Sequence, residues 1–311
     1  MLKFKRIAKY VLEEEMDRDQ NKNVSDIAGN KSSTAQENRS QAVTKNIHHD
    51  VQPPPIKREG ECDPYDALHP AMRWSYEEKT ARAEEKVQQV LNFLGSGETW
   101  STLAVITALL RTSEQTARRL LKRLQKELFV KVDDVYVNGG QLKIYGITKL
   151  GLMAAENAHE LCTVYEVGRL SASIVRHYTS IQMQRIILEQ KSNFSKWVPE
   201  KILLARLPRE LREGTSIPDA IANSEIGFRF AIEIELNLKS ETRMLKAVQQ
   251  HIASLESKRY IGVLYFTDKV PQLKHLLAKV GPIENSEGEE VSLSETEWYK
   301  WFVVCTLGEK F

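Results

Sequence analysis

The sequence has few cysteines, no long apolar run and almost no net charge, and each absence excludes a class of protein. Only Cys62, Cys162 and Cys305 are present, an odd number set far apart, which suits neither a disulfide framework nor a paired-cysteine zinc site. No stretch approaches the roughly 20 apolar residues that a membrane-spanning helix needs. The net charge of +2 implies no general affinity for nucleic acid, so DNA binding would require local clusters of charge. We therefore expect a soluble protein of the reducing cytoplasm, without membrane insertion.

The first residues also lack the features of a secretory signal, because the start MLKFKRIAKYVLEEEMD has no small-residue cleavage site. Apolar residues at helical spacing predict a short amphipathic helix over residues 1–16. Residues 17–75 have too few apolar side chains to offset the entropy of ordering, and they are predicted to form a disordered linker arm that tethers or recruits. The remaining length suffices for two domains, which we place at 76–160 and 161–311.

Residues 76–160 contain three helical patterns followed by alternating runs. The helices are predicted over Tyr76–Phe93, Thr99–Leu110 and Ser113–Glu127, the last of them capped by Thr112. Two short alternating runs, Leu128–Val132 and Val135–Val137, precede the turn sequence Asn138-Gly139-Gly140, which is typical of a β-hairpin. Three helices and a hairpin form the winged helix-turn-helix arrangement, in which the third helix commonly enters the major groove of DNA.

The third predicted helix is basic on the side away from its apolar stripe. The competing interpretation is a solvated face that only keeps the domain soluble. Its position in a helix-turn-helix pattern favours contacts with phosphates of double-stranded DNA over base recognition. The candidate DNA-binding residues are Arg118, Arg119, Lys122, Arg123 and Lys126.

Residues 161–311 alternate between helical and extended patterns. A helix over 164–190 precedes three extended segments at 201–207, 216–221 and 228–238. A helix over 241–257, an apolar strand over 260–266, a helix over 270–280 and a strand over 299–307 follow. The predicted fold class is therefore α+β or α/β, with a mixed sheet flanked by helices after the winged helix.

The stretch from Phe228 to Leu238 carries the candidate chemistry. It alternates, so Glu233 and Glu235 share one face opposite a continuous apolar face. Two like charges on one face of an enclosed strand are costly unless a cation compensates them. The competing interpretation is a half-buried strand whose outward face is simply polar.

The segment YGITKLGLMAAE resembles the ending of many winged-helix domains. Pro218-Asp219, the acids of the next strand and the helix after them resemble the PD-(D/E)xK restriction-endonuclease-like fold. Together with the upstream winged helix, they are similar to the plasmid replication-relaxation family and its neighbours, the MOBC relaxases of mobilisable plasmids. This resemblance spans about residues 81–307.

The resemblance implies a site for Mg²⁺ or Mn²⁺ on Asp219 and Glu233, which agrees with the preference of hard cations for carboxylate oxygens. The motif expects lysine where this chain has Glu235, which is therefore a third candidate ligand and catalytic residue. Lys239 lies roughly 20 Å from Glu233 if the strand stays extended, too far for its side chain. The motif's lysine therefore stays unassigned. Further candidates are Glu200, His177, Lys239 and Lys246.

These features predict a DNA relaxase or nickase of a mobilisable or conjugative element, which binds duplex DNA near a transfer origin and cuts one strand. No tyrosine nucleophile is evident, so a metal-dependent, tyrosine-independent cut is expected. An accessory mobilisation or coupling protein would be a partner. The alternatives are a non-catalytic DNA-binding accessory or regulatory protein with a degenerate nuclease-like domain, and a replication initiator.

Overall fold

The computed structural model describes residues 74–137, 139–168, 170–208 and 217–309. The predicted helix over 1–16 lies outside these residues, as does nearly all of the predicted linker arm over 17–75. The chain divides into two compact units, Met1–Lys79 and Thr80–Phe311. The second unit holds every element described below beyond the first turn of α2, and the predicted boundary at residue 160 stays a prediction.

The part of the chain up to residue 168, called the first part below, begins with helices. It contains α2 (Tyr76–Phe93), the π-helical turn η2 (Leu94–Glu98), α3 (Leu103–Leu110) and α4 (Glu114–Lys126). The predicted start of the second helix at Thr99 is wrong, because a short strand, β1 (Trp100–Thr102), comes first. Thr102 ends that strand and caps α3 by accepting a hydrogen bond from the Val105 amide. The cap of α4 is Ser113 rather than Thr112.

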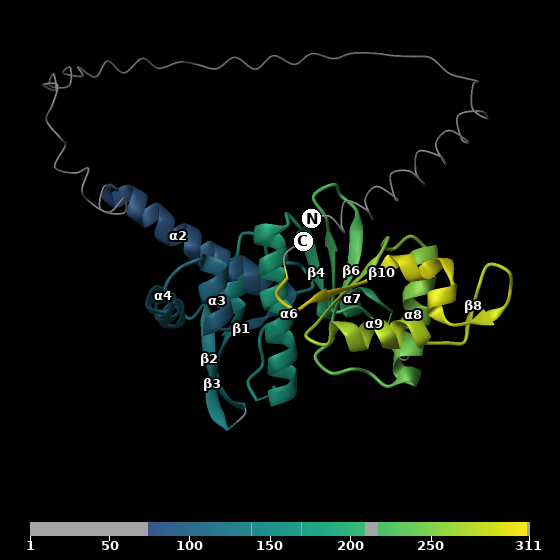
Figure 1. The fold of residues 1–311 in the computed structure, drawn as a ribbon. Coiled ribbons are helices and arrows are strands. Elements are labelled where there is room, and N and C mark those ends of the chain that lie inside the picture. Colours follow the sequence, from purple (N-terminus) through teal and green to yellow (C-terminus); the bar gives the residue numbers. More distant parts are fainter. Residues whose placement is uncertain (1–73, 138, 169, 209–216, 310–311) are drawn as a thin grey trace, which may run out of the picture. The chain divides into compact units, whose positions relative to one another are not determined.

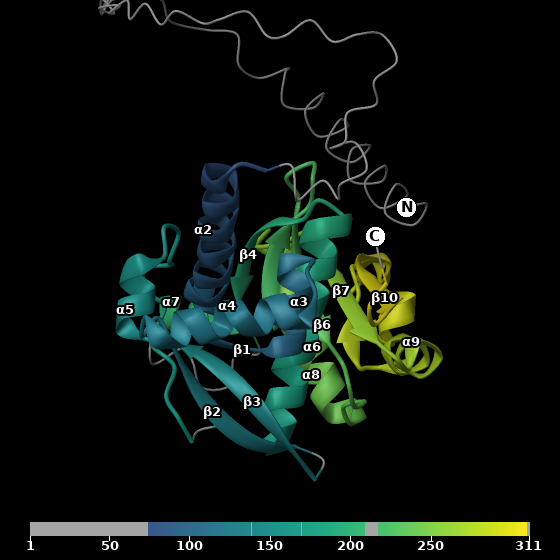
Figure 2. The same ribbon diagram turned by 90° about the vertical axis from the view of Figure 1, so that its left-hand side faces the viewer.

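A long hairpin follows the helices, as the turn sequence predicted. Strands β2 (Val130–Val137) and β3 (Gly140–Ile147) pair antiparallel, and β1 joins β3, so the sheet order is β1-β3-β2. Figure 2 shows this hairpin extending beyond the helices. The two short runs expected before the turn form one continuous strand, β2. Thr148 then caps the short helix α5 (Lys149–Ala154).

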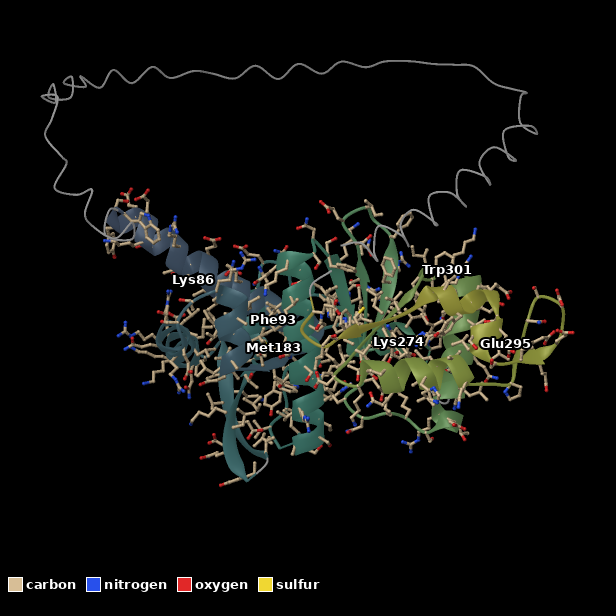
Figure 3. The ribbon with its side chains drawn as sticks, in the orientation of Figure 1. Lys86, Phe93, Met183, Lys274, Glu295 and Trp301 are labelled. Carbon is tan, nitrogen blue, oxygen red and sulfur yellow. The ribbon has the colours of Figure 1, made fainter. Side chains whose placement is uncertain are left out.

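The hydrophobic core of this part includes residues of α6 (Ala172–Lys191), the helix that begins the second part. Phe93 of α2 lies in this core, and Met183 of α6 packs against it (Figure 3). The remaining buried members come from the three helices, η2, the hairpin and α6, for example Leu91, Ile106, Leu121, Leu124 and Ile147. The first part therefore packs its core against α6, whereas the sheet with α8 and α9 encloses a separate core.

The second part is built on a five-stranded mixed sheet of order β10-β7-β6-β5-β4. Strands β10, β7 and β6 run parallel, whereas β5 pairs antiparallel with both β6 and β4. Figure 1 shows α6 on one side of this sheet and α8 and α9 on the other. The bounds are β4 (Ser195–Pro199), β5 (Ala220–Asn223), β6 (Arg229–Ile234), β7 (Val263–Thr267), β10 (Phe302–Thr306), α8 (Glu241–Glu256) and α9 (Val270–Lys279).

One predicted strand is a helix. Residues 201–207 were expected to be extended, but Glu200–Arg206 form α7, and the edge strand β4 lies just before it. A short apolar run has no periodicity that separates a buried strand from a helix. Between α9 and β10, the chain forms the small ladder β8 (Ile283–Glu284) and β9 (Glu290–Val291) and the 3₁₀ turns η4 (Leu293–Glu295) and η5 (Glu297–Trp301). No helix among the described residues is long and apolar enough to cross a membrane.

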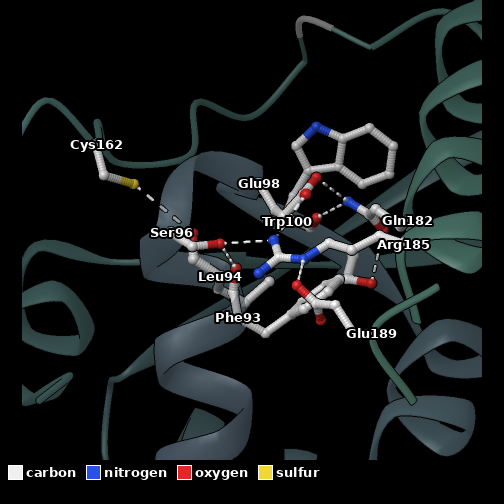
Figure 4. Close-up of polar contacts among 10 residues, drawn as sticks. Phe93, Leu94, Ser96, Glu98, Trp100, Cys162, Gln182, Arg185 and Glu189 are labelled. Atoms are coloured by element: carbon white, nitrogen blue, oxygen red, sulfur yellow. Dashed lines mark hydrogen bonds and ion pairs between the residues drawn. The ribbon is translucent and has the colours of Figure 1, made fainter. Parts of the chain in front are cut away.

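A buried polar network joins α6 to the helical part (Figure 4). The Arg185 guanidinium donates hydrogen bonds to Ser96 (2.7 Å), Glu98 (2.9 Å) and Glu189 (2.9 Å). Its carbon lies 4.7 Å from the centre of the Phe93 ring. Only 9% of the Arg185 side chain and 2% of the Glu98 side chain are exposed. A buried charge needs such partners, so this network holds the two parts in one arrangement.

Candidate functional site

A cavity of about 620 Å³ lies where the first turns of α6 meet the carboxyl end of β6. The segment just before β5 completes its wall. Three of the four sequence-predicted acids, Asp219, Glu233 and Glu235, meet there together with His177 and Lys239. The lining residues are Ala172, Ser173, Arg176, His177, Ile217, Asp219, Glu233, Ile234, Glu235, Leu236, Asn237 and Lys239.

Strand β6 is shorter than its alternation predicted. It ends at Ile234, although the Glu235 amide still donates to the Phe266 carbonyl of β7 (2.9 Å). The chain then turns back, and the Lys239 ammonium forms an ion pair with Glu235 and lies 3.9 Å from Glu233. The predicted separation of roughly 20 Å between Lys239 and Glu233 is therefore wrong, because it assumed a strand extended to Leu238.

The face that carries the two glutamates is enclosed rather than open. Glu233 is 7% exposed and Glu235 is 5% exposed, because β6 lies inside the sheet and its Ala231 belongs to the core beneath α8. Burial raises the pKa of the Glu235 carboxyl, although the Lys239 ammonium opposes the rise. Burial also disfavours the charged form of Lys239, but the carboxylates of Glu233 and Glu235 outweigh it and raise the pKa of Lys239. Lys239 is thus the cation that compensates the two like charges.

Asp219 lies just before β5, next to β6, and is held by two contacts. One carboxylate oxygen is 3.0 Å from His177 Nε2, and the other accepts a hydrogen bond from the Ile234 amide (2.7 Å). The hydrogen bond with Asp219 raises the pKa of His177. His177 therefore faces the cavity instead of the core and connects α6 to the acid of the Pro218-Asp219 step.

Two further candidates lie outside the cavity lining. Glu200 begins α7, where its carboxylate accepts a hydrogen bond from the Tyr178 hydroxyl (2.8 Å) and burial raises the pKa of Glu200. Its amide donates to the Asp219 carbonyl (2.9 Å), so Glu200 lies directly behind the cavity wall. Lys246 is exposed on α8 and does not line the cavity.

His251 is a site residue that no pattern in the sequence indicated. It is 3% exposed on α8, with Nε2 3.3 Å from a Glu233 oxygen and Nδ1 2.7 Å from the Tyr260 hydroxyl. The sequence placed His251 in the apolar stripe of its helix, and that stripe does face the sheet. Nothing in the sequence indicated that Glu233 lies opposite it. His251 therefore lies against Glu233 from behind, although its Nε2 makes no hydrogen bond with any residue that the structure describes.

The cavity offers two carboxylates that a hard divalent cation held mostly by water could bind. Mg²⁺ usually keeps several waters and binds one or two carboxylates together with substrate phosphates. Asp219 and Glu233 border the same cavity and could supply two carboxylates, whereas Glu235 is paired with Lys239. Within the described residues, no three His, Cys, Asp or Glu side chains form a group that could hold a metal ion. The predicted set of three carboxylates is therefore not found as a group.

The basic residues of α4 are all exposed, but they differ in their partners. Arg118 pairs with Glu114, and Arg123 pairs with Glu84 (2.7 Å) and Glu127 (2.8 Å). Such exposed pairs contribute little stability and can be exchanged for other anions. Three cations form no ion pair with any residue that the structure describes, namely Arg119, Lys122 and Lys126.

No protein-family model matches this chain, and neither does any curated protein or solved structure. The coarse fold class is confirmed, because the chain forms a mixed α+β arrangement of helices and sheets. The resemblance to plasmid relaxases rests on the residues and on the order of elements.

Proposed function

We propose that this protein is a metal-dependent DNA endonuclease that nicks one strand of duplex DNA near a transfer origin, as the resemblance to relaxases implies. The observation that carries the proposal is the meeting of Asp219, Glu233 and Lys239 at one cavity. Two acids and a lysine are what the PD-(D/E)xK motif requires, and here the lysine comes from the turn after β6. The Lys239 ammonium would thus serve in place of the lysine that the motif expects at position 235.

The order of elements supports the same assignment. Helix α6, strand β4, helix α7, strands β5 and β6, helix α8 and strand β7 follow one another, with Asp219 just before β5 and Glu233 near the end of β6. Apart from the inserted α7, this is the order expected of the nuclease-like fold. Upstream, three helices and a hairpin follow the order expected of a winged helix, and α4 would place its exposed cations on DNA phosphates.

The chemistry would be hydrolysis of a phosphodiester. A water molecule attacks the phosphorus, one P–O bond forms and another breaks, and the two products carry a phosphate and a hydroxyl group. A divalent cation on Asp219 and Glu233 would neutralise negative charge and lower the pKa of water. Lys239 adds a fixed positive charge toward the transition state, and Glu235 holds its ammonium in place. His177 and the Ile234 amide keep Asp219 oriented.

The tyrosines support water as the nucleophile. No tyrosine that the structure describes lines the cavity. Tyr178 comes nearest along the chain, but its hydroxyl donates to Glu200, and burial raises the pKa of this phenol well above its ordinary value. Tyr260 and Tyr265 are 3% and 0% exposed.

A second function, a DNA-binding accessory without chemistry, is favoured by two observations. Asp219 and Glu235 are already engaged by neighbouring side chains, and the described residues contain no group of three metal-binding side chains. Such a protein would bind duplex DNA and leave it intact.

The test is a nicking assay with Mn²⁺ and a supercoiled plasmid that carries the origin of the protein's own element. The Asp219→Asn variant keeps a hydrogen-bond acceptor for Ile234 but removes the charge, so we expect nicking to be lost and DNA binding to remain. The matched control is Glu256→Gln, an exposed acid on α8 outside the cavity. Calorimetric titration of Mn²⁺ should show weaker binding to Asp219→Asn than to the control. Equal nicking and equal Mn²⁺ binding by the two variants would refute the site.

A further inference from the structure

Arg176 lies on the α6 wall of the cavity, next to His177 in the chain. Because His177 is bonded to Asp219, this turn of α6 is anchored to the acid side of the cavity. Arg176 is exposed and is one of the residues that line the cavity. A cation accessible to solvent therefore borders an acidic cavity.

The Arg176 guanidinium forms no hydrogen bond or ion pair with any residue that the structure describes. This is notable because three carboxylates line the same cavity. Their partners explain it: Asp219 contacts His177 and the Ile234 amide, whereas Glu235 and Glu233 contact Lys239, and Glu233 also contacts His251. By contrast, Arg118, Arg123 and Arg185 are all paired with glutamates. Arg176 is thus free to bind an anion from outside.

The proposed substrate supplies such an anion at the right place. A nucleic-acid strand carries one phosphate per nucleotide, so a phosphate at Asp219 and Glu233 brings its neighbour close to the cavity rim. The planar guanidinium matches the geometry of a phosphate and can donate two parallel hydrogen bonds. Ser173 and Asn237 border the same cavity and add neutral hydrogen-bonding groups without adding negative charge.

We propose that Arg176 binds the phosphate adjacent to the scissile one and so positions the strand for cleavage; this rests on the proposed nuclease function. The acidic cavity alone repels a DNA strand, and Arg176 offsets that repulsion on the side where the strand enters. Arg176 is a substrate-positioning residue, distinct from the cations of α4, which would hold the duplex elsewhere.

The test measures DNA binding without cleavage. Wild type, Arg176→Gln and Arg176→Lys are titrated with a fluorescein-labelled 30-nucleotide single strand and with its duplex, in Ca²⁺, over a series of NaCl concentrations. The matched control is Lys274→Gln, which removes one exposed cation of α9 outside the cavity (Figure 3). For Arg176→Gln we expect roughly tenfold weaker binding at low salt. The slope of log K against log salt should fall by about 0.7 for the single strand and 0.9 for the duplex.

The variants distinguish a phosphate contact from a structural role. Arg176→Lys should keep the salt slope, because it keeps the charge, but bind more weakly than wild type, because lysine lacks the planar fork. Lys274→Gln should match wild type. The proposal is overturned if Arg176→Gln keeps the wild-type slope, or if Lys274→Gln lowers the slope equally. Failure of the wild type to nick its plasmid in Mn²⁺ would overturn the nuclease function instead, and the binding slopes would separate the two failures.

Discussion

Replacing Lys239 with methionine removes the ammonium that lies between two nearly buried carboxylates and keeps most of the side-chain volume. Glu235 loses its ion-pair partner, and Glu233 loses a positive charge 3.9 Å away. The contact of His251 with Glu233 is unaffected. The variant therefore isolates the charge compensation in the cavity.

Removing one partner of a fully buried ion pair costs about 3–5 kcal/mol. Because 33% of the Lys239 side chain is exposed, water screens part of this interaction, and we expect a loss of about 1–3 kcal/mol at pH 8. For a unit of this size, such a loss corresponds to a decrease in Tm of roughly 2–12 °C. Nicking should be lost as well, since the fixed positive charge near the reacting phosphate is gone.

The loss of unfolding free energy in Lys239→Met should depend on pH, and the pKa shifts of Glu235 and Lys239 give its direction. The pKa of Glu235 is raised in the folded protein, so its stabilising contribution is complete below the ordinary value of 4.5 and is lost as pH rises through the folded value. Without Lys239, the pKa of Glu235 rises further. The pKa of Lys239 is also raised, so its contribution persists until pH rises past 10.5. The difference between wild type and Lys239→Met should therefore be smallest near pH 4.5 and larger at pH 8.

Urea unfolding in EDTA between pH 4.5 and pH 8 measures this difference. Lys246→Met, an exposed lysine of α8 outside the cavity, is the matched control and should unfold as wild type does. The double variant Glu235→Gln with Lys239→Met should recover much of the lost stability, because it removes the unpaired charge. An equal loss at pH 4.5 and pH 8, or an equal loss in Lys246→Met, would show that Lys239 does not compensate the charge of Glu235.

Two further predictions concern stability away from the cavity. Arg185→Met should lower the free energy of unfolding by about 3–5 kcal/mol, because it leaves Glu98 buried without its charge partner. The double variant with Glu98→Leu and Arg185→Met should be more stable than Arg185→Met alone. Free energies of unfolding from calorimetry in which the losses of the two single variants simply add in the double variant would contradict a coupled pair. Asp133→Asn tests the contacts beside the hairpin. The Gly168 amide and the Tyr165 hydroxyl lower the pKa of Asp133, so its contribution is present above 3.8 and is lost as pH falls further. Wild type should lose stability more steeply than Asp133→Asn between about pH 4 and pH 2 in acid-unfolding curves, and parallel curves would argue against this.

The helices of the first part and the hairpin could be predicted because local rules decide them. The stripe of α4 and the Asn138-Gly139-Gly140 turn are visible in the sequence, and α4 and the paired strands β2 and β3 occur where they were expected. Local rules failed for α7, whose apolar run suits a strand equally well. The contacts made by Glu200 at the start of α7 involve Tyr178 and Asp219, which lie far away in the sequence.

The acids of the candidate site were recognisable from alternation and from the Pro218-Asp219 step, because those features are local. The cation of the site, Lys239, could not be recognised in this way, because its position depends on where β6 ends and on how the chain turns back. Likewise, His177 and His251 could be placed on helices, but which acid each contacts depends on how those helices pack against the sheet.

Periodicity and turn chemistry act over a few residues, so the mixed α+β character, the order of most elements and the candidate acids could be recognised in the sequence alone. The pairing of Lys239 with Glu235, and the place of Arg176 beside the cavity without a described partner, depend on the packed fold. The buried network through which Arg185 joins the two parts depends on it as well. These arrangements bring together residues far apart in the chain or beyond the end of a strand. The cost of burying unpaired charge selects such pairings, and that cost exists only once the chain has packed.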